Sequence, residues 1–260
     1  MKLLRKRLNM RFLMIATLAC AAAFFASTSA QAAVIYQTNV AHATEIATAA
    51  NLLASQLGTT ATGVVGSSIG TAVSTASSGD ILFIGQSGFA GGAADIAGIT
   101  SFVSSGGIFL KLRDDAGGLF SGVTGETGVF ISDGIGAQNT IGQSSNAAGT
   151  TFAGLGAFLP SVNDHGAITS ASGIDMYNRM GTVPLRSHIV THSVGLGSAT
   201  WLSWDWCCGA TAAQRLAWDD ALFAAATFTG GETNGVPEPS TLALLGLGLA
   251  GLGALRRRKV

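Results

Sequence analysis

Residues 80–112 constrain the fold more than any other stretch of the chain. Residues 80–85 form a continuous apolar run of strand length, which is typical of a strand covered on both faces. Residues 93–105 carry apolar side chains at helical spacing, and Gly106-Gly107 ends that helix before a second strand at 108–112. A strand, a helix and a strand in this order predict a βαβ unit with parallel strands.

The segments around this unit have less regular patterns. A glycine-rich stretch at 113–149 is expected to be an insertion on the open side of the sheet. Two strands joined by a tight glycine turn at 194–197 are expected to pair antiparallel. The other expected elements are a strand at 34–38, a helix capped by Thr44 that ends at Gly58, and a helix from Thr211 to Phe228 with Leu216, Leu222 and Phe223 towards the core.

The pattern resembles the glutamine amidotransferase-like branch of the flavodoxin-like folds. Two stretches of the chain show this resemblance. In residues 102–112 a helix ends in Val-x-x-Gly-Gly before the next strand, and residues 194–206 with Trp218 match the last part of the fold. The resemblance implies an α/β fold of three layers with a mostly parallel sheet, flavodoxin-like or class I glutamine amidotransferase-like, and a glycine-rich insertion. It would also need a nucleophilic cysteine at a Gly-x-Cys-x-Gly elbow, which neither Cys207 nor Cys208 provides, so the chemistry is expected to be lost.

The first 32 residues are typical of a secretory signal peptide. A basic region at 1–11 precedes an apolar region at 12–25, and Ala30-Gln31-Ala32 offers a small-x-small cleavage site, with residues 28–30 as a second choice. We therefore expect export through the Sec translocon.

The last 25 residues form a second targeting segment. Val236, Pro237, Glu238 and Pro239 precede an apolar run at 242–255, and Arg256, Arg257, Arg258 and Lys259 follow it. At ~1.5 Å per residue the run is ~21 Å long, so it nearly spans a bilayer core if the flanking residues snorkel. The basic cluster should stay cytoplasmic.

This order of parts resembles the PEP-CTERM sorting signal of Gram-negative bacteria, which is read by a membrane-embedded protease of the exosortase type. The alternative is an ordinary C-terminal anchor that is never cut. We thus expect a signal peptide at 1–32, an α/β extracellular domain at 33–229, a linker at 230–235, and a sorting signal with a transmembrane helix at 236–260.

The charge of the predicted domain argues against nucleic acid as a partner. Residues 33–235 hold five basic and thirteen acidic side chains, so their net charge is 5 − 13 = −8. Nucleic-acid binding needs a basic surface. A negative charge of this size suits an exported protein that self-repulsion keeps soluble.

Ser87 is the weak catalytic candidate. It lies in Gly85-Gln86-Ser87-Gly88-Phe89, where a nucleophile elbow would have Gly-x-Ser-x-Gly, and Phe89 replaces the last glycine. His165, His188 and His192, with Asp164, Asp175 and Asp205, could complete a triad on paper. The alternative is that Ser87 is a loop residue after a buried strand.

No metal or cofactor is predicted. His188 and His192, with Asp164 and His165, could in principle ligate a metal, but spacing alone does not establish a site. Cys207 and Cys208 could form a strained vicinal disulfide or remain thiols. Trp201, Trp204 and Trp206 would either pack in the core or stack on sugars.

These features predict an exported protein of the cell surface or extracellular matrix, sorted by an exosortase. We expect a non-catalytic structural or binding role linked to exopolysaccharide and biofilm. The alternatives are a secreted serine hydrolase that uses Ser87 and a degenerate amidotransferase-like carbohydrate binder.

Overall fold

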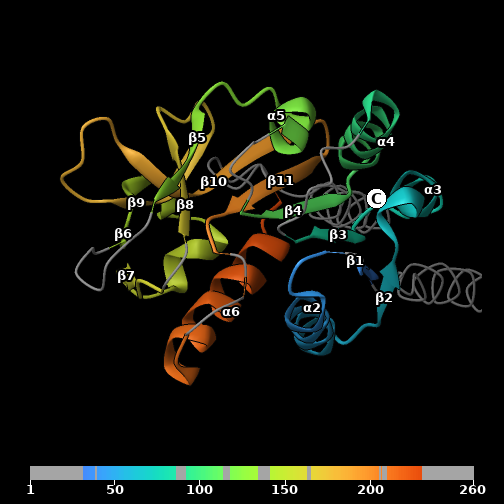
Figure 1. The fold of residues 1–260 in the computed structure, drawn as a ribbon, viewed down its shortest axis with the longest axis horizontal. Coiled ribbons are helices and arrows are strands. Elements are labelled where there is room, and N and C mark those ends of the chain that lie inside the picture. The colour runs from blue at the N-terminus through green and yellow to red at the C-terminus, as the bar shows by residue number, and fades with distance from the viewer. Residues whose placement is uncertain are drawn as a thin grey trace, which may run out of the picture.

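A computed structural model describes residues 32–38, 40–85, 92–113, 118–133, 141–162, 165–204, 206 and 210–229. These residues form a mixed sheet of eleven strands with helices on both faces (Figure 1). The main path of the sheet runs β2-β1-β3-β4-β11-β10-β9-β6-β7, and β5 and β8 join it through β10.

One half of the sheet is parallel. Its strands are β1 (Val34–Gln37), β2 (Ala61–Val64), β3 (Ile81–Ile84), β4 (Ile108–Leu112) and β11 (Gly197–Leu202). The side chains of β3 and β4 are all buried, as the continuous apolar runs predicted. The expected parallel pairing of these two strands is confirmed.

Helices cover both faces of this parallel half. In Figure 1, α2 (Ala43–Leu57) and α6 (Ala212–Ala226) lie on one face, and α3 (Ile69–Ser74), α4 (Ala93–Ser104) and α5 (Gly118–Thr124) lie on the other. Two separate hydrophobic clusters correspond to these two faces. The strands contribute to both clusters because successive side chains point to opposite faces.

The other half of the sheet is antiparallel. It contains β5 (Val129–Asp133), β6 (Ile141–Gln143), β7 (Phe158–Leu159), β8 (His165–Thr169), β9 (Ile174–Arg179) and β10 (Arg186–Val194). Strand β10 is its centre, because it pairs antiparallel with β8, β9 and β11. Three 3₁₀ turns complete the described elements, at Gly66–Ser68, Ser145–Ala147 and Thr151–Gly154.

The expectation of a mostly parallel, three-layer sheet of flavodoxin-like or glutamine amidotransferase-like type is wrong. Four strand pairings are parallel and six are antiparallel among the described residues. The glycine-rich stretch at 113–149 is not a separate insertion, because β5 and β6 pair with β8 and β9 of the same sheet. Strands β5 and β9 were missed because the buried polar residues Asp133 and Asp175 break their apolar pattern.

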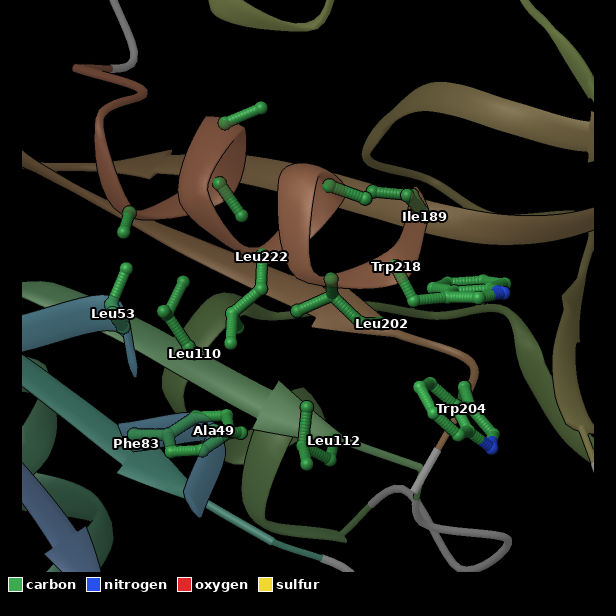
Figure 2. Close-up of a cluster of buried hydrophobic side chains, with 14 of the residues drawn as sticks. Ala49, Leu53, Phe83, Leu110, Leu112, Ile189, Leu202, Trp204, Trp218 and Leu222 are labelled. Atoms are coloured by element: carbon green, nitrogen blue, oxygen red, sulfur yellow. The ribbon is translucent and has the colours of Figure 1, made fainter. Parts of the chain in front are cut away.

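The core on the α6 face joins both halves of the sheet. Figure 2 shows Phe83, Leu110 and Leu112 from the parallel strands against Ala49 and Leu53 of α2 and Leu222 of α6, with Ile189, Leu202, Trp204 and Trp218 nearby. Leu216 was expected in this core but is 60% exposed, and Trp218 is fully buried instead. Trp201, Trp204 and Trp206 are also buried, so the sugar-stacking alternative for them is wrong.

The β10–β11 hairpin is confirmed, and glycine explains its close fit. Gly195 has φ +62, and a Cβ at Gly197 would lie 2.1 Å from the carbonyl oxygen of Gly107. The helix cap at Thr211 is also confirmed, since its side chain accepts from Gln214 in a capping box. Helix α2 begins two residues earlier than expected, with His42 and not Thr44 as its N-cap.

Within the described residues, no helix combines the length and the apolar character that crossing a bilayer requires. The predicted signal peptide up to residue 31, the linker and the sorting helix lie outside the described residues.

Candidate functional site

Four buried polar residues meet where the antiparallel half of the sheet joins the parallel half. Asp133 ends β5, His165 begins β8, His188 lies in β10, and Ser203 follows β11 directly. Their exposed fractions are between 0 and 2%. Buried polar groups are costly unless they are hydrogen-bonded, so the partners of these side chains decide what the cluster can do.

Ser203 connects the two histidines. Its Oγ lies 3.1 Å from Nδ1 of His165 and 3.1 Å from Nδ1 of His188. The backbone N–H of Val162 donates to Nε2 of His165 at 2.9 Å. On the far side, Nε2 of His188 lies 3.5 Å from Oδ2 of Asp133.

These contacts fix the direction of the protons. Because Nε2 of His165 accepts from Val162, the neutral ring carries its proton on Nδ1 and donates to Ser203. The Ser203 hydroxyl can then donate to Nδ1 of His188, which leaves the His188 proton on Nε2, facing Asp133. The result is a directed chain, here called the Val162–Asp133 chain, that runs through His165, Ser203 and His188.

The Val162–Asp133 chain ends at the ionised carboxylate of Asp133. Arg179 donates to Oδ1 of Asp133 at 3.1 Å, and Arg186 contacts the same oxygen. Burial alone would raise the pKa of Asp133, but the contact with His188 and the charges of Arg186 and Arg179 together lower it to about 2.

The two histidines are neutral. Burial lowers the pKa of His165 to about 3, and burial also lowers the pKa of His188. A neutral imidazole both donates and accepts, which is what each ring must do in this chain.

The Val162–Asp133 chain contains the residue types of a catalytic triad but is closed to substrates. A nucleophilic serine must expose its hydroxyl to the reacting atom, and Ser203 has no exposed surface. In addition, Ser203 contacts Nδ1 of His188 and the carboxylate faces Nε2, which is the reverse of the usual triad order. The geometry supports a role in fastening β5, β8, β10 and the end of β11 together.

A second polar network holds the loop before β9. Glu126 accepts from the backbone N–H groups of Gly128, Ser172 and Gly173 at 2.6, 2.8 and 3.0 Å, and from the Ser172 hydroxyl at 2.9 Å. Nε2 of His192 lies 2.9 Å from the same carboxylate. Burial raises the pKa of Glu126, but these bonds outweigh it and lower the pKa to about 2.

An open pocket of about 520 Å³ lies beside this network. It is lined by Ser145, Asn146, Ala148, Gly149, Ser172, Gly173 and Ile174. The lining contains no charged side chain, and the Ser172 hydroxyl and the backbone N–H groups of Ser172 and Gly173 already donate to Glu126.

The structure separates the histidines that the sequence grouped as candidate metal ligands. His165 and His188 are together, with ring centroids 5.6 Å apart, whereas His192 contacts Glu126. Within the described ranges, no three His, Cys, Asp or Glu side chains are placed to hold a metal ion. Ser87, Asp164, Asp205, Cys207 and Cys208 lie outside the described residues.

Sequence reasoning missed Ser203 and Glu126. Ser203 directly follows a buried strand, but a serine there has no motif that marks it. Glu126 contacts residues 46 and 47 positions later, a separation that no local pattern reveals.

The tail of the chain matches a known sorting family. Residues 235–259 match the PEP-CTERM protein-sorting motif. The chain therefore carries a sorting signal of the kind that an exosortase processes. No curated protein matches the chain.

The described fold is similar to part of several solved glycosidases. With a cold-adapted β-galactosidase from Rahnella sp. R3 the identity is 13% and the TM-score 0.50, over 75% of this chain and 30% of the enzyme. β-Galactosidases from Bacillus circulans sp. alkalophilus and Halorubrum lacusprofundi give 13% and 14% identity, each with a TM-score of 0.47, over 67% and 76% of this chain.

The chain spans only about a third of the length of these enzymes: 30% of the Rahnella enzyme, 29% of the Bacillus circulans enzyme and 30% of the Halorubrum lacusprofundi enzyme. At this identity the similarity concerns the fold alone. It gives no support to the resemblance to glutamine amidotransferases.

Replacing the central hydroxyl tests the Val162–Asp133 chain. Ser203→Ala leaves a nitrogen of each buried histidine without its partner, so we expect the free energy of unfolding to fall by about 3 kcal/mol. The matched control is Ser101→Ala at an exposed position of α4, with an expected change within about 0.5 kcal/mol. Chemical denaturation measures both, and equal effects would contradict a fastening role.

The neutral histidines also predict acid sensitivity. Their pKa values are lowered in the folded state, so the unfolded chain binds more protons below pH 6.5, and stability falls as pH falls from 6.5 towards 3. Each histidine contributes a slope of up to about 1.4 kcal/mol per pH unit. Denaturation between pH 6.5 and 5 should show this slope, and His165→Gln should reduce it; an unchanged slope in that variant would count against the assignment.

Proposed function

We propose that this chain is an exported protein that an exosortase-type membrane protease sorts to the cell surface or extracellular matrix. In this proposal residues 1–32 direct export through the Sec translocon and are removed. Residues 242–255 then hold the protein in the inner membrane, with residues 256–259 on the cytoplasmic side. Cleavage near residues 236–239 releases residues 33–235 to the exterior.

The sorting motif at 235–259 is the observation that carries this proposal. Its physical parts act in sequence. Proline fixes φ and lacks an amide donor, so the prolines on either side of Glu238 would favour an extended segment that a protease can reach. The apolar run and the basic cluster stop translocation at a fixed depth.

The role that we propose for residues 33–229 is structural or binding, and not catalytic. The closure of the Val162–Asp133 chain supports this, because its serine and histidines serve the fold. A binding role linked to exopolysaccharide would use the open pocket beside Glu126, whose lining contains no charged side chain.

Changing the sorting motif tests the delivery step. In a strain that produces the protein, the combined change Pro237→Ala, Glu238→Ala and Pro239→Ala should block cleavage and leave the unprocessed chain in the membrane fraction. The apolar run and basic cluster are untouched, so anchoring itself should persist. Immunoblots of membrane, surface and medium fractions measure the outcome; normal release of the variant would refute sorting through this motif.

The alternative is a secreted serine hydrolase that uses Ser87. One observation favours it: Ser87 closely follows β3 in the sequence, and ligands of α/β sheets usually bind beyond the carboxyl ends of parallel strands. We expect Ser87→Ala to change no hydrolytic activity of the purified protein towards ester, peptide or glycan substrates. A hydrolytic activity that this substitution abolishes would establish the alternative.

A further inference from the structure

We infer that, while the protein is anchored, one defined edge of its sheet lies against the lipid surface. This is the amino edge, defined as the end of the parallel half where β1, β3, β4 and β11 begin. The inference rests on the proposed function, because it requires the C-terminal segment to hold the protein at the membrane. It adds which side of the domain faces the lipid and which side faces outward.

The amino edge is well defined by the strand register. Val34 pairs with Ile81, Ile81 pairs with Ile108, and Ile108 pairs with Ser198. The first residues of β1, β3 and β4 and the second residue of β11 therefore lie side by side in one row.

Both ends of the described chain leave from this row. At the N-terminal end, Ala33 donates to Oδ1 of Asp80 at 2.8 Å and accepts from the backbone of Ile81 at 2.8 Å. At the C-terminal end, the Ser198 hydroxyl donates to the carbonyl of Phe228 at 2.7 Å. The segments that continue to both predicted membrane regions thus start at the same edge.

The connecting segments are short compared with the domain. Twelve residues, 230–241, separate the described chain from the C-terminal apolar run, and a flexible segment of that length has an r.m.s. span of ~19 Å. Before the signal peptide is removed, six residues, 26–31, also separate the described chain from the N-terminal apolar run, with an r.m.s. span of ~13 Å. A domain of about 200 residues has a radius of gyration of ~16 Å, so a C-terminal segment of this length favours orientations with the amino edge nearest to the bilayer.

The surface chemistry of the amino edge suits this placement. The turns at this edge are at residues 58–60, 75–80, 105–107, 195–196 and 227–229. Apart from Asp80, they contain only serine, threonine, glycine, alanine, leucine and phenylalanine. Asp80 is the one charged residue in these turns, and its carboxylate bonds the backbone N–H groups of Ala33 and Ser77. Leu196, at the tip of the β10–β11 turn, is 81% exposed.

The distribution of charge allows the amino edge to approach lipid. Residues 33–235 carry a net charge of −8, which anionic headgroups would repel at close range. An edge whose turns carry one buried, hydrogen-bonded carboxylate avoids that repulsion. The exposed Leu196 side chain can then enter the interfacial region, which favours apolar groups.

Site-specific photo-cross-linking to lipid tests the inference. The full chain is reconstituted into vesicles of phosphatidylethanolamine and phosphatidylglycerol, with p-benzoylphenylalanine in place of Leu196 or, in the matched control, of Val183. Val183 is also apolar, lies in a turn and is 99% exposed. It precedes the opposite end of β10, whose nine residues separate the two turns by about 30 Å.

We expect lipid adducts from position 196 and none from position 183. Equal adducts from both positions, or adducts from position 183 alone, would overturn the inference while leaving anchoring intact. Vesicle flotation is measured on the same samples. A chain that does not float with the vesicles would instead refute the proposed anchoring, and the inference would fall with it.

Discussion

The carboxylate of Asp133 lies below the surface between two arginines and a neutral histidine. An ion in such a position is tolerated only if its neighbours are held in place. Here Arg179 and Arg186 come from the two strands of one hairpin, and His188 is oriented by Ser203 and, through it, by His165. The charge at the end of β5 is thereby connected to the segment that follows β11, in the parallel half of the sheet.

This arrangement explains how one sheet can change from parallel to antiparallel without a separate domain. Strand β11 pairs parallel with β4 on one side and antiparallel with β10 on the other. At its end, Ser203 and Trp204 contribute to two different interactions. Ser203 bonds the buried histidines, while Trp204 packs with Trp206 and Trp218 at the end of the α6-face core. The polar chain and the aromatic cluster therefore stabilise the same junction, which suits a protein that must remain folded outside the cell.

The parallel half could be predicted from sequence because its signals are local. The runs at 80–85 and 108–112, the glycines between them and the cap at Thr211 each specify an element within a few residues. Apart from the β10–β11 hairpin with its local glycine turn, the antiparallel pairings could not be predicted, because they join β5 to β8 and β6 to β9 across long separations. The buried positions of the antiparallel half also hold His165, Ser187 and His188, which look like surface residues in a one-dimensional pattern.

The candidate sites divide in the same way. The sorting motif is contiguous and was identified from residues 236–259 directly, in agreement with the family match at 235–259. His165 and His188 were singled out as possible metal ligands, but their actual partner, Ser203, is 38 residues from His165 and 15 from His188, and it has no distinguishing neighbours. The cluster of His165, His188 and Ser203 could be identified only from the three-dimensional structure, because its members are distant in the sequence.

The mass of the mature protein, recovered from the surface or medium of a producing strain, tests the central claim most directly. We predict a chain that begins near residue 33 and ends between residues 236 and 241, without the apolar run or the basic cluster. A recovered chain that still ends at Val260 would contradict the account.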